Sequence, residues 1–176
     1  MTYILDTNII LDSVENLLTL SDNGTNTLVI PETVIDELDS KKVGFEDINF
    51  NARQFARLLE DSVILENKVV APLHIIKTSV ESLGINLLII SKKDYECDLH
   101  TTAPNILNDR KILEAASDYI NKVEPATLIS LDIMFRTRAL SLGLAAEALT
   151  GKSSEQPNEC HKHLKVDNVS SLNGLP

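Results

Sequence analysis

Aromatic residues and long apolar runs are scarce in this sequence. Its 176 residues include three tyrosines, four phenylalanines and no tryptophan, which gives no indication of a base-stacking platform for nucleic acid. No apolar run approaches the length of a bilayer span, and Asp6 interrupts the segment that would be apolar in a signal peptide. A hydrophobic fraction of 43% excludes a disordered chain. Because neither a bilayer span nor a signal peptide is readable, we expect a soluble, cytoplasmic domain.

Cysteine and positive charge are scarce as well. The two cysteines, Cys97 and Cys160, lie far apart in polar surroundings and belong to no Cys-x-x-Cys pair, which favours free thiols. Lysine and arginine together number 16 against 26 acids, so the net charge is −10. A charge of this sign repels nucleic acid at long range. It excludes coating of nucleic acid through bulk positive charge but leaves room for a local basic groove.

Short apolar runs alternate with helical patterns along the chain. The runs are typical of strands buried on both faces of a parallel sheet, and they span residues 3–5, 28–30, 87–90 and 128–131. The predicted helices span residues 8–20, 31–42, 45–62, 109–123 and 133–142. This alternation indicates right-handed crossovers. It predicts an α/β fold, with one three-layer α/β/α domain over residues 1–150 around a central parallel sheet.

Two segments interrupt this rhythm. A polar insertion spans residues 92–107, and its acids Asp94, Glu96 and Asp98 would either approach a site or screen it from substrate. A polar C-terminal tail spans residues 151–176 and contains a short apolar patch at 164–166. We expect this patch to add an edge strand and the tail to be dispensable for chemistry.

Two predicted strands end in an acid where a helix begins. Asp6 follows the first run and precedes Thr7 and Asn8, and Asp132 follows the fourth run. The carboxyl ends of parallel strands lie at the edge of the sheet where open α/β folds hold their ligands. Acids in such positions also cap helices, so a capping role alone remains an alternative for Asp6. The two acids together favour a site at this edge.

Two predicted helices contribute further acids. Glu37 flanks the buried stripe of its helix, where it can reach a pocket at the sheet edge. Asp109 lies on the same helical face as the apolar residues that follow it, so it faces the protein interior, while Asn108 serves as the helix cap. The alternatives are a solvated acidic face for the first helix and a charge beside the positive helix end for the second.

Converging carboxylates require a counter-charge. Like charges in one pocket repel by several kcal/mol when nothing offsets them. No lysine or arginine lies in the two strand ends. A hard divalent cation that prefers oxygen ligands, Mg²⁺ or Mn²⁺, is the natural counter-charge.

In this order the acid motifs make the sequence resemble a PIN-domain nuclease. Residues 4–8 resemble the first motif of the family, Glu37 its helix acid, Asn108 with Asp109 its third acid, and residues 130–132 its fourth. The resemblance covers roughly residues 1–150. Within the family, residues 29–31, 36–39 and 51–53 are most similar to the PIN half of PhoH-like proteins. The chain is then either a stand-alone nuclease or one domain of a longer protein.

The resemblance implies a metal-dependent nuclease, usually one that cleaves RNA. Asp6, Glu37, Asp109 and Asp132 carry over as the catalytic and metal-binding acids, and Asn8 and Ser130 as supporting polar groups. One or two divalent ions would orient a water and neutralise charge on the scissile phosphate. Glu37 or Asp109 would help to deprotonate that water.

Arginines are the candidate phosphate contacts. Arg53 and Arg57 are one helical turn apart and would form a small basic ridge, while Arg110, Lys111, Arg136 and Arg138 are expected near the proposed site. The substrate-binding candidates are Arg53, Arg57, Arg110 and Arg136. A solvated helix face is the alternative for them. We expect weak, salt-sensitive binding of single-stranded RNA. An antitoxin, an ATPase domain and a second copy of the chain in a homo-oligomer stay open as partners, and no membrane is expected.

Two other functions fit the same acids. A non-catalytic domain would keep them for metal-dependent folding or for a partner protein. An aspartate-based phosphatase would use Asp6 as its nucleophile, but that chemistry wants a second aspartate two residues later, where this chain has Asn8.

Overall fold

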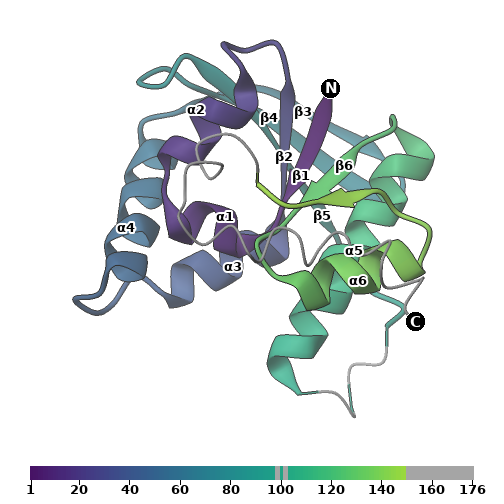
Figure 1. Cartoon of the computed structure of the whole chain (residues 1–176). Coiled ribbons are helices and arrows are strands. Elements are labelled where there is room, and N and C mark those ends of the chain that lie inside the picture. The colour runs from purple at the N-terminus through teal and green to yellow at the C-terminus, as the bar shows by residue number, and fades with distance from the viewer. Residues whose placement is uncertain (98–99, 101–102, 150–176) are drawn as a thin grey trace.

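The computed structural model describes residues 1–97, 100 and 103–149. Within them, seven strands form one sheet in the order β3-β4-β5-β2-β1-β6-β7 (Figure 1). The strands are β1 (Thr2–Leu5), β2 (Thr27–Pro31), β3 (Val63–Val70), β4 (Leu73–Val80), β5 (Ile85–Lys92), β6 (Thr127–Ile129) and β7 (Ala146–Glu147). The helices are α1 (Thr7–Asp12), α2 (Glu15–Ser21), α3 (Glu32–Ser40), α4 (Asp47–Glu60), α5 (Pro104–Lys122) and α6 (Ile133–Ser141).

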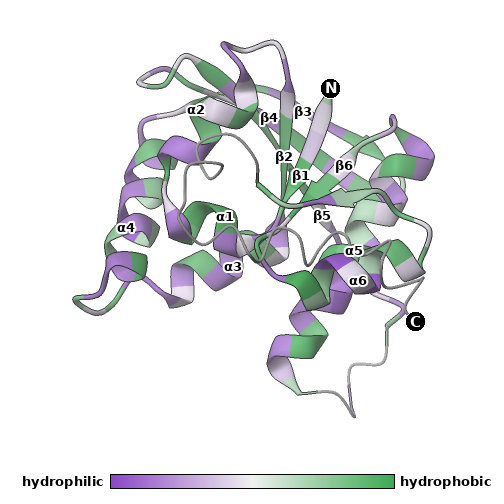
Figure 2. Ribbon diagram, in the orientation of Figure 1, coloured by the Kyte–Doolittle hydropathy of each residue, from purple (hydrophilic) through white to green (hydrophobic). Residues whose placement is uncertain are grey.

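The four apolar runs form the centre of the sheet, as the sequence predicts. They fall in β1, β2, β5 and β6, which pair in parallel. Ile4, Leu5, Leu28, Val29 and Ile30 are completely buried. Such complete burial follows from cover on both faces of a parallel sheet. Figure 2 shows apolar residues on these strands, while the outer helix α4 carries both polar and apolar residues.

The helices complete the predicted three-layer α/β/α arrangement. From β1 the chain moves through β2 to β5 along the sheet, and from β5 it crosses back to β6 and then β7. Right-handed crossovers in opposite directions place helices on opposite faces. Accordingly, α1 to α4 lie on one side of the sheet and α5 and α6 on the other (Figure 1). The direction changes beside β1, and such a switch point is where open α/β sheets bind ligands at the carboxyl ends of their strands.

The expected parallel centre of the sheet is confirmed, and an antiparallel hairpin extends it at one edge. β3 and β4 form a hairpin that pairs antiparallel to β5, so the sheet is mixed. Residues 73–80 gave no strand prediction because the alternation of Leu73 and Ile75 breaks at Ile76 and continues with the buried polar Thr78. Residues 63–70 gave none because β3 is exposed along almost its whole length. Its apolar residues therefore do not alternate with polar ones as those of a half-buried strand do.

Two helix boundaries also differ from the sequence prediction. The segment at residues 8–20 is divided into α1 and α2, and α5 begins at Pro104 instead of at residue 109. The polar insertion is correspondingly shorter, because its first residue belongs to β5 and its last ones to α5. Proline suits a first helical turn because its missing N–H needs no partner there. The predicted end of α6 at Gly143 is confirmed by its left-handed backbone, with φ of 84°.

The polar tail, including the strand predicted at residues 164–166 and Cys160, lies outside the described residues. So does Asp98. Among the residues that are described, no helix combines the length and the apolar character needed to cross a bilayer.

Candidate active site

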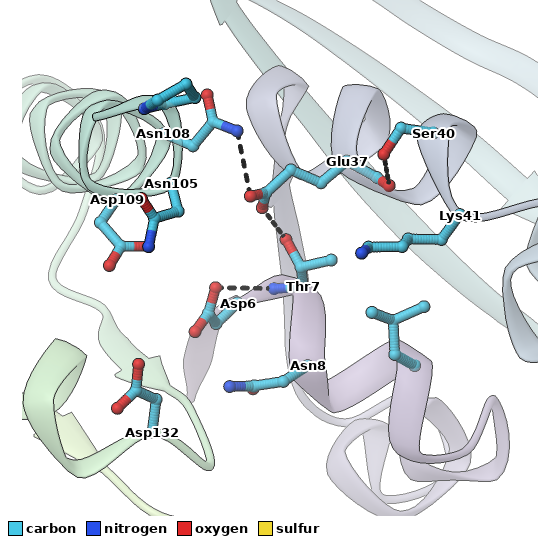
Figure 3. Close-up of a pocket in the computed structure, with 12 residues that line it drawn as sticks. Asp6, Thr7, Asn8, Glu37, Ser40, Lys41, Asn105, Asn108, Asp109 and Asp132 are labelled. Carbon is cyan, nitrogen blue, oxygen red and sulfur yellow. Dashed lines mark hydrogen bonds between the residues drawn. The ribbon is translucent and has the colours of Figure 1, made fainter. Parts of the chain in front are cut away.

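The four predicted acids meet in a pocket at the carboxyl edge of the sheet. This pocket has a volume of about 400 Å³. Its lining comes from the end of β1, from α1 and α3, from the start of α5 and from the turn after β6. It includes all four predicted acids (Figure 3). These are Asp6, Glu37, Asp109 and Asp132. Segments that are far apart in the sequence thus bring their carboxylates to one place.

Asp6 is the most deeply buried of these acids, with 6% of its surface exposed. One carboxylate oxygen accepts a hydrogen bond from the Thr7 N–H at 2.8 Å, and the other accepts one from the Ser130 hydroxyl at 2.6 Å. Burial raises the pKa of Asp6, with smaller upward contributions from Glu37 and Asp132, while the two hydrogen bonds act in the opposite direction. The alternative role holds as well, because Asp6 is also the N-cap of α1. Capping and a place in the pocket are compatible.

Asn8 and Ser130 tie the ends of β1 and β6 together. The Asn8 amide donates to the Ser130 hydroxyl at 3.3 Å, and its carbonyl oxygen accepts from the Leu131 N–H at 3.1 Å. The Ser130 hydroxyl also accepts from the Asp132 N–H at 3.0 Å. Because one hydroxyl contacts both strand ends, it fixes the position of Asp6 relative to Asp132.

Glu37 is held from two sides. Its carboxylate accepts a hydrogen bond from the Thr7 hydroxyl and another from the Asn108 amide at 3.1 Å (Figure 3). The neighbouring acid Asp39 instead lies exposed and pairs with Lys42. The expectation that a flanking acid of this helix reaches the pocket therefore applies to Glu37 alone. Asn108, predicted as a helix cap, is in the interior of α5, and its side chain orients Glu37.

Asp109 faces the pocket from α5 and pairs with Arg138 of α6 at 3.0 Å. A cation thus reaches the acids from α6, although none lies in the strand ends. Burial and the nearby charge of Asp6 raise the pKa of Asp109 to about 6, against the opposite effect of Arg138. The repulsion among the acids is therefore only partly offset by side chains.

Asp132 occupies the N-cap of α6, where it accepts a hydrogen bond from the Met134 N–H at 2.9 Å. It is the most exposed of the four acids, and Figure 3 shows its carboxylate on the same side of the pocket as Asp6 and Asp109. Like Asp6, it combines a capping position with access to the pocket.

The donor set of the pocket fits a hard divalent cation. Carboxylates provide oxygen ligands, and the raised pKa values of Asp6 and Asp109 reflect burial and like charges that a cation would relieve. As placed, no three His, Cys, Asp or Glu side chains among the described residues form a ready-made metal cluster.

The predicted substrate-binding arginines do not line the pocket. Arg57 and Arg110 are exposed on α4 and α5. Arg53 donates to the backbone carbonyls of Lys42 and Gly44 at 2.6 and 2.9 Å. Arg136 donates to the Ser130 carbonyl at 2.6 Å. Arg53 and Arg136 thus hold the backbone, so the expectation of a basic ridge formed by Arg53 with Arg57 is wrong for Arg53.

Replacing Arg53 by alanine is expected to lower the free energy of unfolding by about 1–2 kcal/mol, because two carbonyls lose a charged donor. The matched Arg57→Ala change removes an exposed side chain that bonds to Gln54 on its own helix, and we expect a change within about 0.5 kcal/mol. Urea unfolding of both variants measures the difference. Equal stability of the two variants would contradict the structural role of Arg53.

Some pocket residues have a role that the sequence did not predict. Thr7 and Asn108 orient Glu37, while Asn105 and Lys41 line the pocket. Thr7 belongs to the first motif, and Asn105 lies one helical turn before Asp109. These positions are weak signals in the sequence that both residues lie near the acids. The acids of the polar insertion that are described, Asp94 and Glu96, do not line the pocket.

Comparison with known proteins now decides the family. A family model described as the PIN domain matches residues 3–150. The chain belongs to the PIN-domain family. Its members are typically metal-dependent nucleases, and the shape and chemistry of the pocket agree with that family character.

Relatives of this PIN domain include proteins named PhoH2. The one from Bacillus subtilis (strain 168) is 28% identical over 151 residues, covering 82% of this chain and 32% of the relative. The one from Mycolicibacterium smegmatis is 28% identical over 146 residues, covering 83% of this chain and 31% of the relative. The chain therefore spans about a third of the length of these relatives. The similarity to PhoH-like proteins expected from the sequence is confirmed.

A solved structure shares the fold. A domain of a functionally unknown protein from Methanocaldococcus jannaschii DSM 2661 superposes with a TM-score of 0.55 at 17% identity, covering 90% of this chain and 96% of that one. This likeness concerns the fold alone.

Proposed function

We propose that this PIN domain is a divalent-metal-dependent ribonuclease that hydrolyses phosphodiester bonds of single-stranded RNA with Mg²⁺ or Mn²⁺. The observation that carries the proposal is the convergence of four acids from four separate segments in one pocket. When bound, the cation would supply Lewis-acid activation of water and neutralise charge that develops on the scissile phosphate.

The protein's part in this reaction is to hold four carboxylates in place. Ser130 and the Thr7 N–H fix Asp6, while the Thr7 hydroxyl and Asn108 fix Glu37. Such outer partners typically contribute about 10- to 100-fold in metal affinity or activity. We assign Asp6, Glu37, Asp109 and Asp132 as the residues that would hold the metal, with Asn8 and Ser130 as their supports.

Proton transfer from water is the task we assign to Asp109. A general base works best when its pKa lies near the working pH, and the pKa of Asp109 is raised to about 6. Both oxygens of Glu37 already accept hydrogen bonds from Thr7 and Asn108. Asp109 is therefore better placed than Glu37 to take a proton in the metal-free pocket, and we propose that it serves as the base when the other three acids hold the metal.

Substrate and partners follow from the family and from charge. An acidic chain holds a polyanion through local contacts, for which Lys41 at the pocket and the exposed Arg57 and Arg110 are the candidates. The PhoH2 relatives are about three times as long as the matched region, so we propose an ATPase domain as one partner. The alternative is a domain that works alone, and in either case we propose the cytoplasm as its location. An antitoxin is the other partner class that the resemblance suggests.

Labelled single-stranded RNA, single-stranded DNA and duplex DNA, each with Mn²⁺, Mg²⁺ or chelator, test the proposal. We expect single-stranded RNA to be cleaved fastest, with cleavage abolished by the chelator. Faster cleavage of duplex DNA would contradict the ribonuclease assignment. Metal binding without cleavage of any substrate would favour the non-catalytic domain, and a phosphorylated Asp6 trapped by mass spectrometry would favour the phosphatase.

A further inference from the structure

The outer edge of β3 lacks a neighbouring strand within the described part of the chain. β3 is exposed at every residue except Val70, and its exposed residues include the large apolar side chains of Ile64, Leu65 and Val69, at 62%, 52% and 71%. An edge strand of this kind presents backbone N–H and C=O groups that can pair with another strand. The occupant of this edge must match the pattern of its side chains.

A second copy of β3 matches that pattern in one register. Two antiparallel copies related by a twofold axis place one residue opposite itself. With Asn67 at this position, Glu66 faces Lys68 of the second copy on both sides of the axis. Leu65 then faces Val69 of the second copy. In this register an acid faces a lysine, an amide faces an amide, and an apolar side chain faces an apolar one.

Neighbouring registers lack this complementarity. A centre at Glu66 or at Lys68 places identical charges opposite each other, which is destabilising. A centre at Leu65 places Glu66 opposite Ile64. A bulge between Ile64 and Glu66 ends the regular part of the strand on that side, so the pairing is short.

We propose that two copies of this chain associate through antiparallel pairing of β3 centred on Asn67, which joins their sheets into one. The association is concentration-dependent, because the pairing is short and each copy has a net charge of −10. β4, β5 and β2 separate β3 from β1 in the sheet. The acidic pocket therefore stays open in both copies.

Charge reversal within the full chain tests the register. In the Lys68→Glu variant positions 66 and 68 are both acidic, so acids of one copy face acids of the other. In the Glu66→Lys variant both positions are lysine, so lysines face lysines. In sedimentation experiments we expect either variant alone to associate at least about tenfold more weakly than the wild type. An equimolar mixture of the two variants is expected to regain association as a heterodimer, because each acidic strand then faces a basic one.

The mixture also controls for effects on folding. Glu66 lies opposite Lys77 of β4, so reversing the charge at position 66 also disturbs the hairpin within one copy. This disturbance is the same whether the Glu66→Lys variant is measured alone or in the mixture, so it cannot explain association that returns on mixing. Glu81→Lys, an exposed charge reversal in the turn after β4, is the matched control and is expected to associate at least as well as the wild type. The proposal is overturned if the wild type is monomeric at every concentration, if the single variants associate as it does, or if mixing restores nothing.

Discussion

Replacing Asp6 by asparagine is expected to lower the rate of RNA cleavage at least about a hundredfold. Loss of an outer partner of a metal ligand already costs about 10- to 100-fold, and this change removes the charge of the most buried acid of the pocket. Asparagine caps helices as well as aspartate does, so α1 is retained. Cleavage rates and Mn²⁺ binding by calorimetry are expected to fall together.

Asp39→Asn is the matched control for this change. Asp39 lies exposed on α3, pairs with Lys42 and does not line the pocket. We expect its loss to leave cleavage and Mn²⁺ binding unchanged. An Asp6→Asn variant that binds and cleaves like Asp39→Asn would remove Asp6 from the site.

Replacing Asp109 by asparagine is expected to stabilise the metal-free protein at neutral pH. The pKa of Asp109 rises from 3.8 to about 6 on folding. Folding therefore favours the protonated form, and its stabilising contribution is complete below about pH 4 and lost as the pH rises through about 6. A shift of this size corresponds to at most about 3 kcal/mol. Asparagine removes the charge, so urea unfolding with chelator should show a smaller decline between these pH values than in the wild type.

Metal ions are expected to reverse this relation. Mn²⁺ competes with the proton on Asp109, so it should raise the melting temperature of the wild type more at about pH 7.5 than at about pH 5. Asp109→Asn should lose most of this increase. If the variant is less stable than the wild type at neutral pH without metal, the ion pair between Asp109 and Arg138 outweighs the repulsion among the acids.

Much of the fold could be predicted because burial leaves a direct mark on the sequence. The strands around Ile4, Val29 and Leu128 are buried on both faces, so their positions must be apolar without interruption. The acids after β1 and β6 were found for the same reason, since an abrupt change from apolar to acidic residues marks a strand end. β3 was missed because it is almost entirely exposed and no burial constrains its pattern. β4 is half-buried, but its apolar alternation breaks at Ile76, so its pattern is not that of a regular half-buried strand.

The contacts within the site could not be predicted in the same way. The bonds of Glu37 to Thr7 and Asn108, and the pairing of Asp109 with Arg138, join residues on different elements. Helical spacing indicates which face a side chain occupies, but not which side chain of another element it meets. Arg53 illustrates the same limit, because its spacing from Arg57 suggested a basic ridge whereas its guanidinium holds the loop before α4.

The central claim, that the four acids form one metal site, is tested most directly by anomalous scattering from crystals soaked in MnCl₂. We expect a manganese peak in the pocket, within coordination distance of carboxylate oxygens of at least two of the residues Asp6, Glu37, Asp109 and Asp132. The Asp6→Asn variant is expected to show a weaker peak or none. A fully soaked wild-type crystal without manganese in this pocket would contradict the claim.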